Sequence, residues 1–112
     1  MEESLKKFLL YTAPTGEIRV DVLLQDESVW LTQKAIAELF GVVKSTVSEH
    51  LTNIYTTHEL EETSTVRKIR TLQTEGNRKV NRDLEYYNLD AIISVGYRVN
   101  SAKATQFRIW AT

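Results

Sequence analysis

The sequence contains no cysteine, one proline, four glycines and two histidines in 112 residues. Without cysteine, the chain forms neither disulfide bonds nor thiolate metal sites. His50 and His58 lie too far apart for a metal-binding pair on one helix, so we expect no metal site. The chain also lacks the apolar run of about 20 residues that a membrane-spanning helix needs. These absences argue against a disulfide scaffold, a zinc protein and a membrane protein.

The remaining composition is that of an ordinary globular domain, with 42% hydrophobic and 26% charged residues. The first residues, MEESLKKFLLYT, do not have the order of a signal peptide, so we expect a cytoplasmic protein. The length suits a single domain over residues 1–112. The last apolar pattern reaches the end of the chain without a stop signal, so we expect a fragment of a longer protein.

Charge is distributed unevenly along the chain. Residues 1–62 contain 5 Lys/Arg and 11 Asp/Glu, a net charge of −6. Residues 63–112 contain 9 Lys/Arg and 4 Asp/Glu, a net charge of +5, so the total is −1. A phosphate backbone responds to a local patch rather than to the total charge. Nucleic acid therefore remains a candidate partner, and its contacts should come mainly from the second half.

Three short strands are predicted before the first helix. The segment EIRVDVLL, residues 17–24, alternates apolar and polar side chains, as a strand with one buried face does. KFLLYT is its expected hairpin partner, across a turn that contains Pro14 and Gly16. A second turn, QDES, leads to VWL. We expect a small β-meander, with Trp30 anchoring it on the helices.

Two short helices are predicted around Gly41. Thr32 is a good N-cap for the first helix, Gly41 suits its end, and the second helix begins at about Lys44. Each helix has one apolar face. These faces consist of Ile36, Leu39 and Phe40 in the first helix and Val47, Leu51 and Ile54 in the second.

The spacing of Ala37, Gly41 and Val47 is that of a DNA-reading helix-turn-helix, with a small residue, a turn glycine and a branched apolar residue. Any antiparallel helix pair with a glycine turn also fits this spacing. Two departures count against the motif. Val43 replaces the usual Ser or Thr cap, and Leu51 falls one position later than the common pattern.

A basic β-hairpin is predicted after the helix pair. The polar segment THELEETST is expected to be a loop, and EGNR, with Gly76-Asn77 at its tip, indicates a tight turn between two strands. Between Arg67 and Arg82 there are six Lys/Arg and one acidic residue, more than a solvated strand face needs. A helix-turn-helix followed by such a hairpin is a winged helix. The expected strands cover roughly residues 65–74 and 79–87.

Two further helices are predicted, capped by Asn88 and by Ser101. Arg98 and Lys103 lie in a tract without acidic residues. They are either a second phosphate contact or positive charges that suit the helix dipole. The carboxylates of Asp83, Glu85 and Asp90 have no evident partner base, and no phosphate-binding glycine loop occurs. We therefore expect no catalytic site and no cofactor.

Three segments, VWLTQKAIAELFGV, EYYNLDAIISVGYRVNS and TQFRIWAT, resemble the N-terminal domain of the RhuM virulence-protein family. The resemblance runs from about Ile18 to Thr112. This bacterial family is in turn loosely similar to phage antirepressor N-terminal domains. The resemblance implies a DNA-binding-type domain, found alone or in front of other domains, including Fic-type domains. It implies no catalytic activity for this part.

The sequence thus predicts an α+β fold, a winged helix-turn-helix with an N-terminal β-meander and a β-hairpin wing. We expect it to bind double-stranded DNA as a transcriptional regulator or DNA-targeting domain, as a homodimer or within a larger protein. The alternative is a protein-interaction or adaptor module of a toxin- or Fic-type protein. The residues expected to contact DNA are Gln33, Lys34, Lys44, Ser45, Thr46, Ser48, Arg67, Lys68, Arg70, Arg78, Lys79, Arg82, Arg98 and Lys103.

Overall fold

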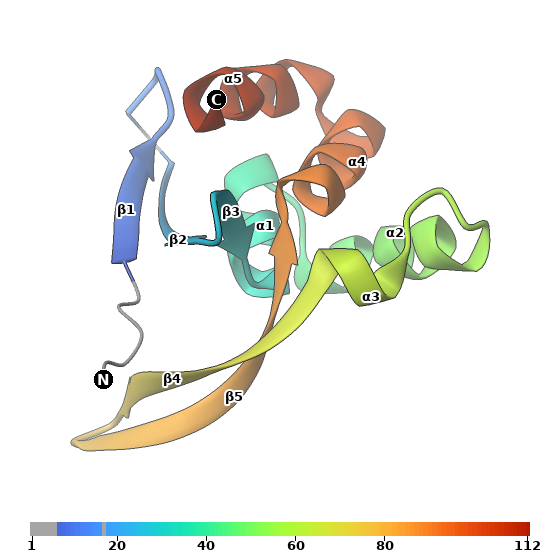
Figure 1. The fold of residues 1–112 in the computed structure, drawn as a ribbon. Helices are drawn as coiled ribbons and strands as arrows, with labels where there is room; N and C mark the ends of the chain where they lie inside the picture. Colours follow the sequence, from blue (N-terminus) through green and yellow to red (C-terminus); the bar gives the residue numbers. More distant parts are fainter. Residues whose placement is uncertain (1–6, 17) are drawn as a thin grey trace.

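The structure is a computed structural model that describes residues 7–16 and 18–112 (Figure 1). Glu17, the first residue of the predicted second strand, lies outside the described residues. The strands are β1 (Lys7–Thr12), β2 (Arg19–Gln25), β3 (Ser28–Leu31), β4 (Val66–Glu75) and β5 (Arg78–Asn88). The helices are α1 (Gln33–Phe40), α2 (Lys44–Thr56), α3 (Glu62–Thr65), α4 (Leu89–Val99) and α5 (Ser101–Ala111). None of these helices is long and apolar enough to cross a membrane.

The strands form one antiparallel sheet in the order β1-β2-β3-β5-β4, so the fold is α+β. Consecutive strands β1, β2 and β3 pair with one another, which confirms the predicted meander. Strands β4 and β5 form the predicted hairpin, with Glu75 opposite Arg78 and Gly76-Asn77 as the connecting turn. Only the last residues of β5 pair with β3, where Leu31 lies opposite Tyr87. The rest of the hairpin extends away from the body (Figure 1).

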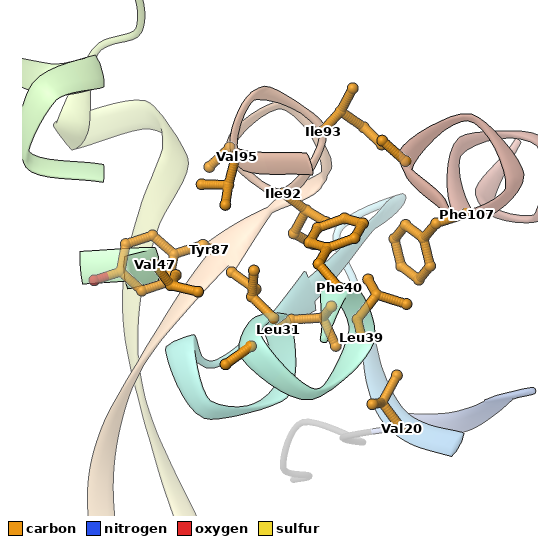
Figure 2. Close-up of a cluster of buried hydrophobic side chains, with 14 of the residues drawn as sticks. Val20, Leu31, Leu39, Phe40, Val47, Tyr87, Ile92, Ile93, Val95 and Phe107 are labelled. Atoms are coloured by element: carbon orange, nitrogen blue, oxygen red, sulfur yellow. The ribbon is translucent and has the colours of Figure 1, made fainter. Parts of the chain in front are cut away.

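The main hydrophobic core lies between the sheet and the helices. It joins the predicted apolar faces of α1 and α2 to residues of α4 and α5, and Phe107 is fully buried (Figure 2). At the crossing of α4 and α5, a side-chain Cβ on Gly96 would lie 2.6 Å from Phe40 Cζ and 2.7 Å from Ala104 Cβ. Gly96 therefore permits a close helix contact that a larger residue would disturb.

Most of the local signals act as predicted. The Ala35 amide donates to Thr32 Oγ1 (3.2 Å), and the Ala91 amide donates to Asn88 Oδ1 (3.2 Å), so both residues are N-caps. Gly41 ends α1 with φ 73° and ψ 35°, the left-handed conformation that glycine adopts without strain. The backbone at the end of α1 thus turns sharply enough to start α2 three residues later.

Three local predictions are wrong. Trp30 does not anchor the meander on the helices. It lies on the opposite sheet face in a second cluster with Leu23, Ile69 and Tyr86, because its neighbour Leu31 occupies the helix side. Part of the expected loop forms α3, where the Thr65 hydroxyl donates to the Glu61 carbonyl (2.7 Å). The N-cap of α5 is Asn100 rather than Ser101, because the Asn100 side chain accepts from the Lys103 amide.

Candidate nucleic-acid interface

The first turn of α2 is exposed to solvent. Val43, Lys44 and Ser45 are exposed, Thr46 is half-buried, and Ser48 is exposed one turn later. No side chain caps this helix, because its N-cap residue is Val43. The Thr46 amide donates to the Val43 carbonyl (3.0 Å), but the backbone N–H groups of the first two residues of an uncapped helix can bind anions. Because Val43 replaces the usual capping residue, backbone N–H donors remain at the start of α2, next to the Lys44 ammonium. In a helix-turn-helix this is the site that would meet phosphate.

A groove of about 730 Å³ separates the start of α1 from the hairpin. Gln33, Lys34 and Lys44 line it from the helix side, so three predicted contact residues come together there. Gln33 is partly committed to the fold, since its Nε2 donates to the Tyr87 hydroxyl (2.9 Å). Burial raises the pKa of that tyrosine above its ordinary value, and the hydrogen bond from Gln33 partly offsets the rise.

Carboxylates outnumber ammonium groups in the same groove. Lys34 and Lys44 share it with four acidic side chains, those of Asp21, Glu38, Asp83 and Glu85. The prediction from sequence did not include these four as residues of the interface. The sequence does contain a signal for Asp83 and Glu85. When the two strands are paired outward from the Gly76-Asn77 turn, these carboxylates lie opposite Arg70 and Lys68, on the same face of the hairpin.

The six basic residues of the hairpin are divided between its two faces. Cross-strand partners share a face and neighbours alternate, and Val66 and Tyr87 mark the helix side because they pack on the main core. Lys68, Arg70 and Lys79 therefore lie on the helix side. Arg67, Arg78 and Arg82 lie on the opposite face, by the same alternation. The hairpin is thus basic on both faces rather than along one stripe.

Several of these guanidinium groups are held by carboxylates. Arg82 donates twice to Glu75, from Nε and Nη2, each at 2.8 Å. These hydrogen bonds lower the pKa of Glu75 below its ordinary value. Arg70 Nε lies 3.2 Å from Asp83 Oδ1. In contrast, Lys68, Arg78 and Lys79 form no ion pair with any residue that the structure describes.

Arg67 fastens the base of the hairpin to the meander. Its guanidinium lies 4.5 Å from the centroid of the Trp30 ring, donates to Gln25 Oε1 (3.0 Å), and forms an ion pair with Asp26. Asp26 and Glu27 form the turn between β2 and β3 with φ of 53° and 59°, a left-handed conformation that costs free energy in residues other than glycine. The contacts of Arg67 therefore hold a strained turn, in addition to any role at DNA.

Arg98 and Lys103 lie away from the hairpin, at the other helices. Arg98 forms an ion pair with Glu59 and donates to the Ser94 hydroxyl (2.9 Å), which fastens α4 to the segment after α2. The hydrogen bonds from Arg98 and Ser94 lower the pKa of Glu59. Lys103 Nζ lies 3.8 Å from the Cβ position of Gly41, at the carboxyl end of α1. Both cations thus lie at helix ends, where a positive charge is favourable, so a structural role accounts for both of them.

Comparison with known families decides the relationship. Residues 64–112 match the model of the Virulence protein RhuM family. This second half of the chain is therefore similar to the RhuM family. The match begins in α3 and covers the hairpin, α4 and α5, a shorter stretch than the resemblance from Ile18 onward. The match stops short of the α1–α2 pair.

No curated protein and no solved structure matches the chain significantly. Among residues 7–16 and 18–112, no group of three or more His, Asp or Glu side chains could hold a metal ion. The proposal for function therefore depends on the geometry of the helix pair and the hairpin.

Proposed function

We propose that this chain is a winged helix-turn-helix domain that binds double-stranded DNA, as a sequence-specific regulator or DNA-targeting domain. One observation carries the proposal: the helix pair and the basic hairpin are built on one sheet through the β3–β5 pairing. This is the order of strand, helix pair and hairpin that a winged helix requires. The uncapped start of α2 would enter the major groove, and the hairpin would follow the phosphate backbone.

The free cations determine how strong the phosphate contact is. Arg67, Arg70, Arg82 and Arg98 already form ion pairs. The strongest candidates for phosphate contact are therefore Lys34, Lys44, Lys68, Arg78 and Lys79. Five neutralised phosphates would give a plot of log K against log[salt] with a slope of about −4 to −5. The four carboxylates of the groove would weaken binding further.

A salt titration of duplex binding tests this proposal. Fluorescence anisotropy of a labelled duplex, measured over a range of salt concentrations, should give a steep negative slope. A slope near zero would contradict phosphate contact. A random-library selection of bound duplexes, using the same protein, would then identify the preferred site.

Two double variants distinguish contacts to the phosphate backbone from contacts to the bases. Arg78→Ala with Lys79→Ala should weaken binding to all duplexes alike and make the salt slope less steep by about two. Arg19→Ala with Arg108→Ala is the matched control, because it removes the same charge from β2 and α5, away from the hairpin tip. An equal loss of affinity in the control would indicate a general charge effect rather than a wing.

Lys44→Ala with Ser45→Ala tests the reading helix. Lysine and serine side chains reach base edges and donate to bases in the major groove. The double variant should bind preferred and random duplexes with nearly the same affinity. Its affinity for random DNA should fall only by the amount expected from the loss of one positive charge. Unchanged discrimination would assign sequence preference to another part of the domain.

The groove itself favours a second candidate function, a protein-interaction module of a toxin- or Fic-type protein. Its four carboxylates and the exposed apolar side chains of Phe8 and Leu72 complement a partner with basic and apolar residues. A domain that does not shift labelled duplex DNA at moderate salt would favour this role.

A further inference from the structure

Strand β1 forms one edge of the sheet and exposes three consecutive large apolar side chains. Phe8, Leu9 and Leu10 are 42%, 39% and 54% exposed. Natural proteins protect edge strands with charges, proline or short length, because an open edge binds other strands. Within β1 only Lys7 is charged. This edge therefore has the properties of a surface that is covered in the working protein.

The backbone groups that face outward from β1 follow from its pairing with β2. The Ala13 amide donates to the Ile18 carbonyl (2.9 Å), in register with the β1–β2 ladder. In an antiparallel pair, residues alternate between those bonded to the partner and those pointing away. The odd residues of β1 therefore bond to β2, and the N–H and C=O groups of Phe8, Leu10 and Thr12 point to the open edge.

We propose that β1 pairs antiparallel with β1 of a second copy of this chain, so that two five-stranded sheets join into one. If the helices of both copies lie on the same side of the joined sheet, the two-fold axis is perpendicular to the sheet. Because opposite residues in an antiparallel pair point to the same face, such an axis must place one residue opposite its own counterpart in the second copy. With the centre at Leu9, Phe8 of each copy lies opposite Leu10 of the other, and the two Leu9 side chains meet.

The chemistry of β1 suits its own copy. Centring on Leu9 sets Lys7 opposite Tyr11, so no like charges face each other. The apolar surface continues on the helix side, where the ring centroids of Tyr11 and Trp110 are 5.1 Å apart and Trp110 is 38% exposed. The other edge strand, β4, carries Arg67, Lys68 and Arg70, which would repel a second β4. Self-pairing is therefore specific to the β1 edge.

Sedimentation equilibrium in the absence of DNA tests the pairing, and its outcome does not depend on the proposed DNA binding. The chain should behave as a dimer of 12.9 kDa protomers that dissociates on dilution. Leu10→Lys should shift the protein to monomer, because it places two ammonium groups beside the pairing. Leu72→Lys is the matched control, since Leu72 is an exposed strand leucine (58%) on the hairpin. A monomeric wild type would overturn the proposal and leave the edge to a different partner.

A cysteine cross-link tests the centre of the pairing. The natural chain has no cysteine, so Leu9→Cys introduces the only thiol. Two residues facing each other at a non-hydrogen-bonded position have Cα atoms about 4.5 Å apart, within the range that a disulfide spans. Oxidised Leu9→Cys should form a covalent dimer rapidly, and Leu72→Cys should not. Equal cross-linking of both variants would overturn the proposed centre, as would a dimer that persists in Leu10→Lys.

Discussion

The helical body and the hairpin are stabilised by different interactions. The body, formed by α1, α2, α4 and α5 on the meander, buries a continuous apolar core with Ile36, Val47 and Phe107 fully inaccessible. The outer hairpin consists mostly of exposed residues, and the cross-strand ion pairs Arg70–Asp83 and Arg82–Glu75 link its two strands. Its base is fastened by Trp30 and Arg67.

The residues that keep the domain folded are therefore largely different from the residues proposed to bind a ligand. Hydrophobic burial stabilises the body, whereas exposed ion pairs contribute little to stability. The outer hairpin, beyond Arg67 at its base, is therefore free to carry charge for a ligand, because its exposed ion pairs contribute little to keeping the domain folded. Three substitutions test this division, from the body outward to the hairpin tip.

The largest effect is expected for Phe107→Ala. Phe107 is fully buried and packs edge-on against Tyr11 at a centroid distance of 5.0 Å. Truncating a buried phenylalanine costs about 3–5 kcal/mol. Chemical denaturation should show this loss, and amide exchange should accelerate throughout the domain. Ile109→Ala, at a 64% exposed position on the same helix, is the control. Similar losses in the two variants would contradict a core centred on the helices.

An intermediate effect is expected for Trp30→Phe, at the junction of the two regions. The substitution removes the hydrogen bond from Trp30 Nε1 to the Gln25 carbonyl (2.9 Å) and weakens the contact with Arg67. A loss of about 1–2 kcal/mol is expected. Amide exchange should accelerate more in β4 than in α1. Trp110→Phe, which leaves this cluster intact, should not produce that pattern.

The smallest effect is expected at the hairpin tip, through Glu75. Arg82 lowers the pKa of Glu75, so this pairing contributes above the unfolded-state pKa and is lost as pH falls through the folded-state value. Carboxyl NMR should show Glu75 titrating below the ordinary range of a glutamate carboxyl. Arg82→Gln should return the pKa of Glu75 to its ordinary value without changing the melting temperature. A clear drop in melting temperature would show that the tip contributes to global stability.

Sequence reasoning was most accurate where the signal was local. The caps at Thr32 and Asn88, the left-handed Gly41 and the Gly76-Asn77 turn all depend on a few neighbouring residues. Sequence reasoning failed for Trp30. Because strand residues alternate, Trp30 and Leu31 must lie on opposite faces of the sheet, but only the assembled sheet decides which of the two faces meets the helices.

The predicted interface shows the same limit. The basic content of the hairpin is a property of the sequence, but its division between two faces depends on register across the turn. The attachment of Arg98 to Glu59 joins residues far apart in the chain, so no local pattern indicates it. The DNA-contact residues remain a prediction, with Lys34, Lys44, Lys68, Arg78 and Lys79 as its strongest members.

The sequence by itself determined the order of the elements, their caps and the uneven distribution of charge, because periodicity and turn chemistry act over a few residues. Only the tertiary structure decided which cations are paired with carboxylates, which acids line the groove beside Lys44, and which strand is left at an edge. These properties depend on contacts between residues distant in sequence, and the packing of the whole chain sets them.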